Sequence, residues 1–266
     1  MPRRIFARRR WDRIGSVIDG CRSIVQSILK EQRAARAGRR ANLPLMRNST
    51  PRALLLDYGG VISISAFERH AQTERILQLA PGSLMWLGPL DPSTDPLWAS
   101  MLRDEITERE YWAFRANEVG LAVGESGWDM LTMAKRLRGA DPNSVIRPEM
   151  QHLVQRARAS GIRVGVLSNE FELFTGVGMA ERIDVLRDMD AFVDATHTKI
   201  LKPDPRAYAL AVEALKCQPS EVLFVDDQFR NIAGAVRAGL QAQFFDLRDV
   251  QGNIAAIAAR LKLTPS

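Results

Sequence analysis

Short apolar runs alternate with segments of helical periodicity along most of this chain. Each run has the length of a strand and is bounded by glycine or polar residues, which is typical of strands buried in a parallel sheet. Strands that alternate with helices pair in parallel through right-handed crossovers. The pattern therefore predicts an α/β fold, a Rossmann-like parallel sheet core with helices on both faces. The predicted strands cover residues 53–56, 162–167, 191–193, 222–225 and 242–245.

Residues 63–147 depart from this alternation, because their pattern is helical. One helix is expected over 66–79, a second opens at a capping box in residues 107–110, and a third covers roughly 127–137. A helical segment placed directly after the first strand predicts a small all-helical cap domain over the carboxyl edge of the sheet.

Residues 1–48 form a basic leader ahead of the core, which comprises residues 49–62 and 148–266. Apolar residues recur in the leader at helical spacing with arginines on the other face, which predicts an amphipathic helix. Three interpretations are open: a helix on an anionic membrane surface, an organellar transit peptide, or a poorly ordered extension ahead of a start at Met46. We favour the third, because Met46 shortly precedes the first strand of the domain.

The net charge of +6 is unevenly distributed. Residues 1–52 carry 14 Lys and Arg against three acidic residues, whereas the rest of the chain carries 23 against 28. The predicted core and cap are thus mildly acidic, which argues against nucleic acid as a partner.

The two cysteines and the hydropathy of the chain indicate the cellular compartment in which the protein is expected. Cys21 and Cys217 lie far apart without metal-type spacing, which favours a reducing compartment and so a cytoplasmic protein. No apolar run approaches the length of a membrane-spanning helix. We expect a monomer or a homodimer, and contact of the leader with a membrane is not favoured.

Polar groups follow three of the predicted strands, and a lysine lies in the polar loop that follows a fourth. They are Asp57, Ser168–Asn169, Asp226–Asp227 and, in the loop, Lys202. In open α/β sheets, ligands bind beyond the carboxyl ends of the strands. The set supplies what phosphoryl transfer through an aspartyl intermediate needs: a carboxylate that attacks, polar groups that hold the phosphoryl oxygens, and further carboxylates that hold Mg²⁺.

The ordered set resembles the haloacid dehalogenase-like (HAD) hydrolase superfamily over about Arg52 to Leu261, and the helical insert lies where that family carries a cap. Both Lys199 and Lys202 are candidates for the lysine of the family's third motif, but the Pro-Asp pair that directly follows Lys202 favours Lys202. The four matching motifs are Leu55–Val61, Leu167–Asn169, Lys202–Asp204 and Phe224–Asp227.

The resemblance implies a role for each motif residue. Asp57 would be the nucleophile, and Lys202 would neutralise it and the transferring group. Ser168 and Asn169, with Gly60, would bind the phosphoryl oxygens of a small phosphorylated metabolite.

The resemblance also implies a Mg²⁺ site formed by Asp57, Asp226, Asp227 and the backbone carbonyl of Gly59. Here the sequence departs from the family, because typical family phosphatases carry an acid–base Asp where this chain has Gly59. General acid–base catalysis is typically worth about 10²–10⁴-fold in rate, so slow hydrolysis is expected unless another group substitutes. Tyr58 is not an obvious replacement.

Three functions therefore compete. The first is a Mg²⁺-dependent phosphoric monoester hydrolase that works through an aspartyl phosphate. The second is a 2-haloacid dehalogenase, whose chemistry needs no protonation of the leaving group. The third is a catalytically weak HAD-like domain that binds a phosphorylated ligand or a protein partner. The retained acid pair Asp226–Asp227 favours the phosphatase.

Overall fold

The computed structural model describes residues 50–139, 141–187 and 189–264. The predictions made for the basic leader lie outside these residues. No helix in the described part of the chain has both the length and the apolar character needed to span a bilayer.

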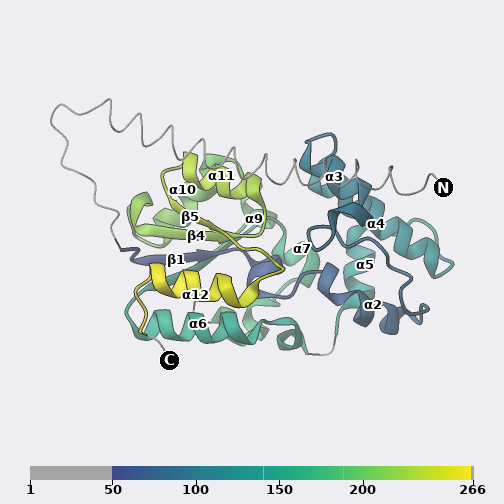
Figure 1. The fold of residues 1–266 in the computed structure, drawn as a ribbon, viewed down its shortest axis with the longest axis horizontal. Coiled ribbons are helices and arrows are strands. Elements are labelled where there is room, and N and C mark those ends of the chain that lie inside the picture. Colours follow the sequence, from purple (N-terminus) through teal and green to yellow (C-terminus); the bar gives the residue numbers. More distant parts are fainter. Residues whose placement is uncertain (1–49, 140, 188, 265–266) are drawn as a thin grey trace, which may run out of the picture.

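Five parallel strands form a sheet in the order β3-β2-β1-β4-β5, with β1 at its centre (Figure 1). All four pairings between neighbouring strands are parallel, which confirms the predicted α/β architecture. No strand boundary differs from the predicted one by more than one residue. The strands are β1 Ala53–Leu56, β2 Arg163–Ser168, β3 Ala191–Asp194, β4 Val222–Asp226 and β5 Gln241–Phe244.

Helices cover both faces of this sheet (Figure 1). Side chains alternate along β1, so that Leu54 and Leu56 join one apolar cluster with residues of α6 and α12, whereas Leu55 joins another with residues of α10 and α11. Burial on both faces is why the β1 sequence is apolar at every position. The helices are α6 Pro148–Ala159, α10 Pro205–Ala214, α11 Phe229–Arg237 and α12 Val250–Arg260.

Between β1 and α6, the described residues form helices and turns but no strand. Figure 1 places these helices beyond the end of the sheet toward which β1 runs. The helix predicted over 127–137 is α5, which begins only at Met130, because the side chain of Asp129 accepts a hydrogen bond from the Thr132 N–H at 2.7 Å and so caps it. The helices of this insert are α2 His70–Leu77, α3 Pro96–Leu102, α4 Glu108–Ala122 and α5 Met130–Leu137, and a short 3₁₀ turn, Phe67–Arg69, precedes α2.

The helical insert has an apolar core of its own, rich in aromatic rings such as Phe67 and Trp98. Asp95 lies fully buried within it. The carboxylate of Asp95 accepts a hydrogen bond from Tyr111 Oη at 2.7 Å and forms an ion pair with the buried Arg115 guanidinium. Buried charges are tolerated when they are paired and hydrogen-bonded, and here that pairing joins α4 to the residue that caps α3.

Three short helices follow the strands of the β2–β3 half of the sheet. The loop predicted between β3 and Lys202 in fact contains one of them, because the Asp194 side chain accepts a hydrogen bond from the Thr196 N–H at 2.9 Å and caps a turn. They are α7 Phe171–Thr175, α8 Asp184–Arg187 and α9 Ala195–Thr198.

Candidate active site

Asp57 directly follows β1 at the carboxyl edge of the sheet. Its backbone N–H donates to the Val225 carbonyl at 2.9 Å, and its buried carboxylate accepts from the Tyr58 N–H at 2.7 Å. The chain then turns through Gly60, whose φ of 77° lies in the left-handed region that favours glycine. Arg147 Nε fixes this turn by donating to the Gly60 carbonyl at 3.0 Å.

Lys202 bridges two carboxylates at the same edge. Its buried Nζ lies 2.9 Å from Asp57 Oδ1 and 2.7 Å from Asp226 Oδ2. The backbone of Lys202 is held by the side chain of Asn169, which accepts from the Lys202 N–H at 2.7 Å and donates to its carbonyl at 3.2 Å. The structure thus shows the Asn169 amide positioning the lysine, whereas its role as a phosphoryl ligand stays a prediction.

Asp226 ends β4 and is fully buried, with its carboxylate oxygens engaged. They accept from the Gln228 N–H at 2.8 Å and from Asn231 Nδ2 at 3.1 Å, in addition to Lys202. Asp227 follows directly. One carboxylate oxygen from each of Asp57, Asp226 and Asp227 lies within 4.8 Å of the other two.

Negative charge exceeds positive charge in this cluster. Burial raises the pKa of Asp57 to about 7, and the charge of Asp226 adds to this effect while Lys202 opposes it. Burial also raises the pKa of Asp227 well above its usual value, reinforced by the charges of Asp226 and Asp57. Burial opposes protonation of Lys202, but Asp226 and Asp57 outweigh it and raise the lysine pKa, so the ammonium form is held firmly.

This donor set fits a hard divalent cation. Mg²⁺ prefers oxygen ligands and is often held by one or two carboxylates, with water completing its shell. Three carboxylates with a single neighbouring ammonium leave charge that such a cation would offset. The residues predicted from the resemblance to hold Mg²⁺ by their side chains are therefore brought together.

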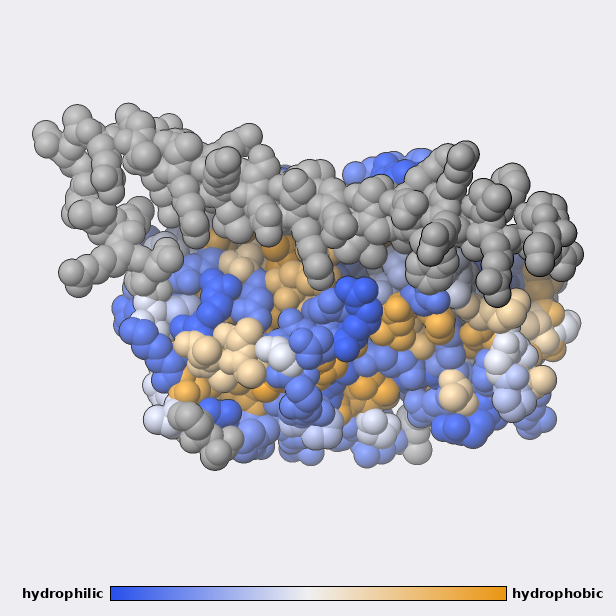
Figure 2. Space-filling model, viewed as in Figure 1, coloured by the Kyte–Doolittle hydropathy of each residue, from blue (hydrophilic) through white to orange (hydrophobic). Residues whose placement is uncertain are grey.

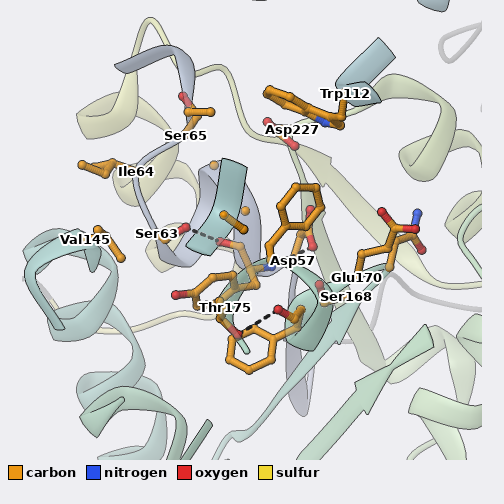
Figure 3. Close-up of a pocket in the computed structure, with 18 of the residues that line it drawn as sticks. Asp57, Ser63, Ile64, Ser65, Trp112, Val145, Ser168, Glu170, Thr175 and Asp227 are labelled. Atoms are coloured by element: carbon orange, nitrogen blue, oxygen red, sulfur yellow. Dashed lines mark hydrogen bonds between the residues drawn. The ribbon is translucent and has the colours of Figure 1, made fainter. Parts of the chain in front are cut away.

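A cavity of about 560 Å³ opens over these groups, lined by the core and by the helical insert. Figure 3 shows Asp57, Ser168 and Asp227 around one space, with Trp112 of α4 nearby. Gly59 and Gly60 also line it. Much of the remaining lining is apolar, and Figure 2 shows apolar side chains on the face where the sheet and the insert adjoin.

Two contacts between the insert and the core border this cavity and were not predicted from the sequence. Gln228 Nε2 donates to Glu108 Oε1 at 2.8 Å, and Arg109 forms an ion pair with Glu170. Glu108 and Arg109 are the first two residues of α4. The capping box signalled that a helix starts there, but the spacing did not show which of its residues face the sheet.

Comparison with known proteins identifies the family. The family model for haloacid dehalogenase-like hydrolases matches residues 52–239. The chain belongs to this family. The resemblance inferred from the four motifs is thereby confirmed, and so is the α/β fold.

Relatives within the family include both dehalogenases and phosphatases. The chain is 30% identical over 112 residues to (S)-2-haloacid dehalogenase 4A of Burkholderia cepacia, a match that covers 42% of this chain and 48% of the relative. It is 31% identical over 99 residues to a phosphatase of Mycobacterium tuberculosis, covering 37% of this chain and 46% of the relative. It is also 26% identical over 191 residues to mouse acyl-CoA dehydrogenase family member 10, covering 71% of this chain but 17% of the relative. The chain thus spans at most about half the length of these relatives.

Solved structures show the same fold at low identity. The magnesium-bound HAD-hydrolase YfnB of Bacillus subtilis superposes with a TM-score of 0.58 at 14% identity, covering 81% of this chain and all of that one. The L-2-haloacid dehalogenase RSc1362 superposes with a TM-score of 0.52 at 18% identity, covering 74% of this chain and 87% of that one.

Proposed function

We propose that this HAD-like hydrolase is a Mg²⁺-dependent phosphoric monoester hydrolase that acts on a small phosphorylated metabolite in the cytoplasm. The observation that carries the proposal is the three-carboxylate cluster of Asp57, Asp226 and Asp227 around the ammonium of Lys202. Dehalogenation has no need for a clustered acid pair, whereas phosphoryl transfer uses a cation to offset charge on the phosphoryl oxygens.

Each residue would then have a defined task. Asp57 attacks phosphorus and carries the phosphoryl group as an aspartyl phosphate until water releases it. Lys202 favours the ionised form of Asp57 and holds its carboxylate in place, and it offsets charge on the transferring group. Asp226 and Asp227, with Asp57, would hold Mg²⁺, which when bound supplies charge neutralisation and orientation.

Substrate oxygens would be received at the ends of β1 and β2. Ser168 lines the cavity beside Asp57 and offers a hydroxyl donor. Gly60 lets the backbone approach closely, since a side chain there would meet Asp227. The cavity volume of about 560 Å³ lies within the range of small-molecule sites, which is why we assign a metabolite and not a macromolecular substrate. In this proposal the helical insert, residues 63–147, acts as the cap that encloses the substrate.

The test is phosphate release from p-nitrophenyl phosphate by the full chain, with Mg²⁺ and with chelator. We expect release that depends on Mg²⁺ and is lost in Asp57→Asn. Glu213→Gln, an acid-to-amide change at an exposed position on α10, is the matched control and should behave as the parent. Release that chelation leaves unchanged, or that survives Asp57→Asn, would refute the proposal.

A 2-haloacid dehalogenase is the second candidate, favoured by one observation at the site. Position 59 carries no carboxyl group, and displacement of a halide needs no protonation of the leaving group. Some of the relatives are dehalogenases. Chloride release from 2-chloropropionate without Mg²⁺, lost in Asp57→Asn, would establish this function instead. Thermal stabilisation by a phosphorylated ligand with no turnover of either substrate would indicate a binding domain.

A further inference from the structure

Neither position 59 nor the core residues Asp57 and Lys202 supply a proton for the alcohol that leaves when a phosphate ester is cleaved. Position 59 has no side chain, and space is open there, because a Cβ built on Gly59 would meet no atom within 4 Å. Asp57 attacks phosphorus, and Lys202 is bonded to both Asp57 and Asp226. An alkoxide is a poor leaving group unless a positioned acid protonates it, so the efficiency of this site depends on another group.

Glu108 is placed to be that group. It is the half-buried first residue of α4 and lines the same cavity as Asp57. Its Oε1 accepts from Gln228 Nε2 at 2.8 Å, and the Gln228 N–H in turn donates to Asp226 at 2.8 Å. The Glu108 carboxyl is thereby held against the loop that carries the acid pair. Among the described residues, none donates a hydrogen bond to its Oε2.

The other carboxyl groups in the cavity lining are already engaged. Glu170 forms an ion pair with Arg109. Asp141 is exposed and accepts from the Asn143 N–H at 2.9 Å as a helix cap. Asp227 belongs to the carboxylate cluster. Glu108 is thus the lining carboxyl outside the cluster that is hydrogen-bonded to the loop carrying the acid pair and is not paired with an arginine.

We infer that Glu108 is the general acid and base of the reaction, delivered by the helical insert in place of a side chain at position 59; this inference rests on the proposed phosphatase function. In the first step, Asp57 forms a bond to phosphorus, the bond from phosphorus to the ester oxygen breaks, and the proton of Glu108 passes to that oxygen to give the alcohol. In the second step, the Glu108 carboxylate takes a proton from water as the water oxygen bonds to phosphorus. The bond from phosphorus to Asp57 then breaks, which releases phosphate and restores both carboxyl groups.

The surroundings of Glu108 favour its protonated form. Burial raises the pKa of Glu108, and the charge of Asp226 adds to this effect. The bond from Gln228 and the positive charges of Arg230 and Lys202 oppose it. Asp227 also faces Glu108 with a negative charge. A carboxyl with a raised pKa can donate a proton closer to neutral pH and take one back in the second step.

The decisive experiment compares esters whose alcohols differ in acidity. Phosphate release is measured for p-nitrophenyl phosphate and phenyl phosphate with the full-length parent, Glu108→Gln and Arg109→Gln. Glutamine keeps an oxygen to accept from Gln228 but has no proton of suitable acidity. We expect Glu108→Gln to lower kcat for phenyl phosphate by about 10²-fold and to affect p-nitrophenyl phosphate far less, since p-nitrophenolate leaves without a proton.

Arg109→Gln separates catalysis from a structural effect, because it breaks the other contact between the start of α4 and the core. Any loss that it causes should be similar for the two esters. Gly59→Asp supplies the second control: in the Glu108→Gln background it should restore phenyl phosphate hydrolysis, because the open space at position 59 accepts a carboxyl side chain. The pH–rate profile of Glu108→Gln should lose the limb that falls as pH rises.

The outcomes distinguish this inference from the proposed function. If Asp57→Asn abolishes release but Glu108→Gln affects both esters equally, or neither, then Glu108 is not the acid and the phosphatase function stands. If the folded parent releases phosphate from neither ester, the proposed function fails and the assignment of Glu108 fails with it.

Discussion

The two adjacent glycines at positions 59 and 60 should respond in opposite ways to the same substitution. Gly60 has a φ of 77°, and a Cβ built on it would lie 2.5 Å from Asp227 Oδ2 and 3.0 Å from its Cγ. Gly59 has a φ of −68° and a ψ of 127°, which any residue adopts, and its Cβ would meet nothing within 4 Å. Gly60→Ala therefore strains the backbone and displaces a proposed Mg²⁺ ligand, whereas Gly59→Ala does neither.

The size of the effect of Gly60→Ala follows from the backbone strain and from the displacement of Asp227. An alanine held in the left-handed region costs about 1–2 kcal/mol. The carboxylate of Asp227 can move aside, so the overlap adds little to the cost of folding but withdraws a ligand from its position. We expect Gly60→Ala to lower the melting temperature by roughly 2–8 °C in chelator and to weaken Mg²⁺ binding by about 10-fold or more. Gly59→Ala should stabilise the metal-free protein by up to about 1 kcal/mol, because alanine restricts the unfolded chain.

Thermal denaturation of both variants in chelator, followed by titration with Mg²⁺, measures the two quantities separately. These readouts do not require substrate, so a methyl group that obstructs the cavity at position 59 does not affect them. The reasoning is refuted if Gly60→Ala matches Gly59→Ala in both melting temperature and Mg²⁺ affinity.

Three further predictions concern buried charge. Lys202→Met leaves Asp57 and Asp226 without their ammonium partner, so it should abolish phosphate release and lower the free energy of unfolding by about 3–5 kcal/mol in chelator, measured by urea denaturation. Asp95→Asn leaves the buried Arg115 without its main carboxylate and should cost about 3 kcal/mol; faster proteolysis within the insert would show it, and unchanged proteolysis and melting would contradict it. The raised pKa of Asp57, about 7 against 3.8, means that the metal-free folded state binds this proton more tightly than the unfolded state, so its stability should fall as pH rises from about 4 to about 7. Mg²⁺ displaces that proton, so the stabilisation by Mg²⁺ should grow over the same window, and a Mg²⁺ effect independent of pH would contradict this.

The sheet and the convergence of its polar residues were predictable because both depend on local pattern. Each strand is buried on both faces, so its apolar run is visible without any knowledge of its neighbours. Parallel strands bring their carboxyl ends to one edge, so Asp57, Ser168 and Asp226 could be expected together from their positions at strand ends. The strand ends did not predict the position of Lys202, which lies in a loop: its pairing with Asp57 followed from the family resemblance, and its ion pair with Asp226 was not predicted.

The spacing of residues in the sequence did not predict how the helical insert docks on the core. The capping box in residues 107–110 predicts a helix. It does not predict which residue of the first turn reaches Gln228, because that depends on how α4 is oriented against the sheet. Residues of α4 pack in the aromatic core of the insert and bond to Asp95, and these partners are distant in sequence. The helix α9 has a weak sequence signal, since it spans four residues and begins only because Asp194, directly after the apolar run of β3, caps it.

The charges of the site link the metal, the lysine and Glu108. With all three carboxylates ionised, the cluster and its one ammonium would carry two excess negative charges, which a divalent cation would cancel; without the cation, the raised pKa values of Asp57 and Asp227 favour their protonated forms. An ionised Glu108 would then add a negative charge where the dianionic phosphate ester must enter, whereas a protonated Glu108 adds none and can donate to the ester oxygen. A carboxyl supplied by α4 is thus not equivalent to a carboxyl at position 59. In the proposed mechanism, the core provides the groups that must be charged, and the insert provides the group that must be neutral when the substrate binds.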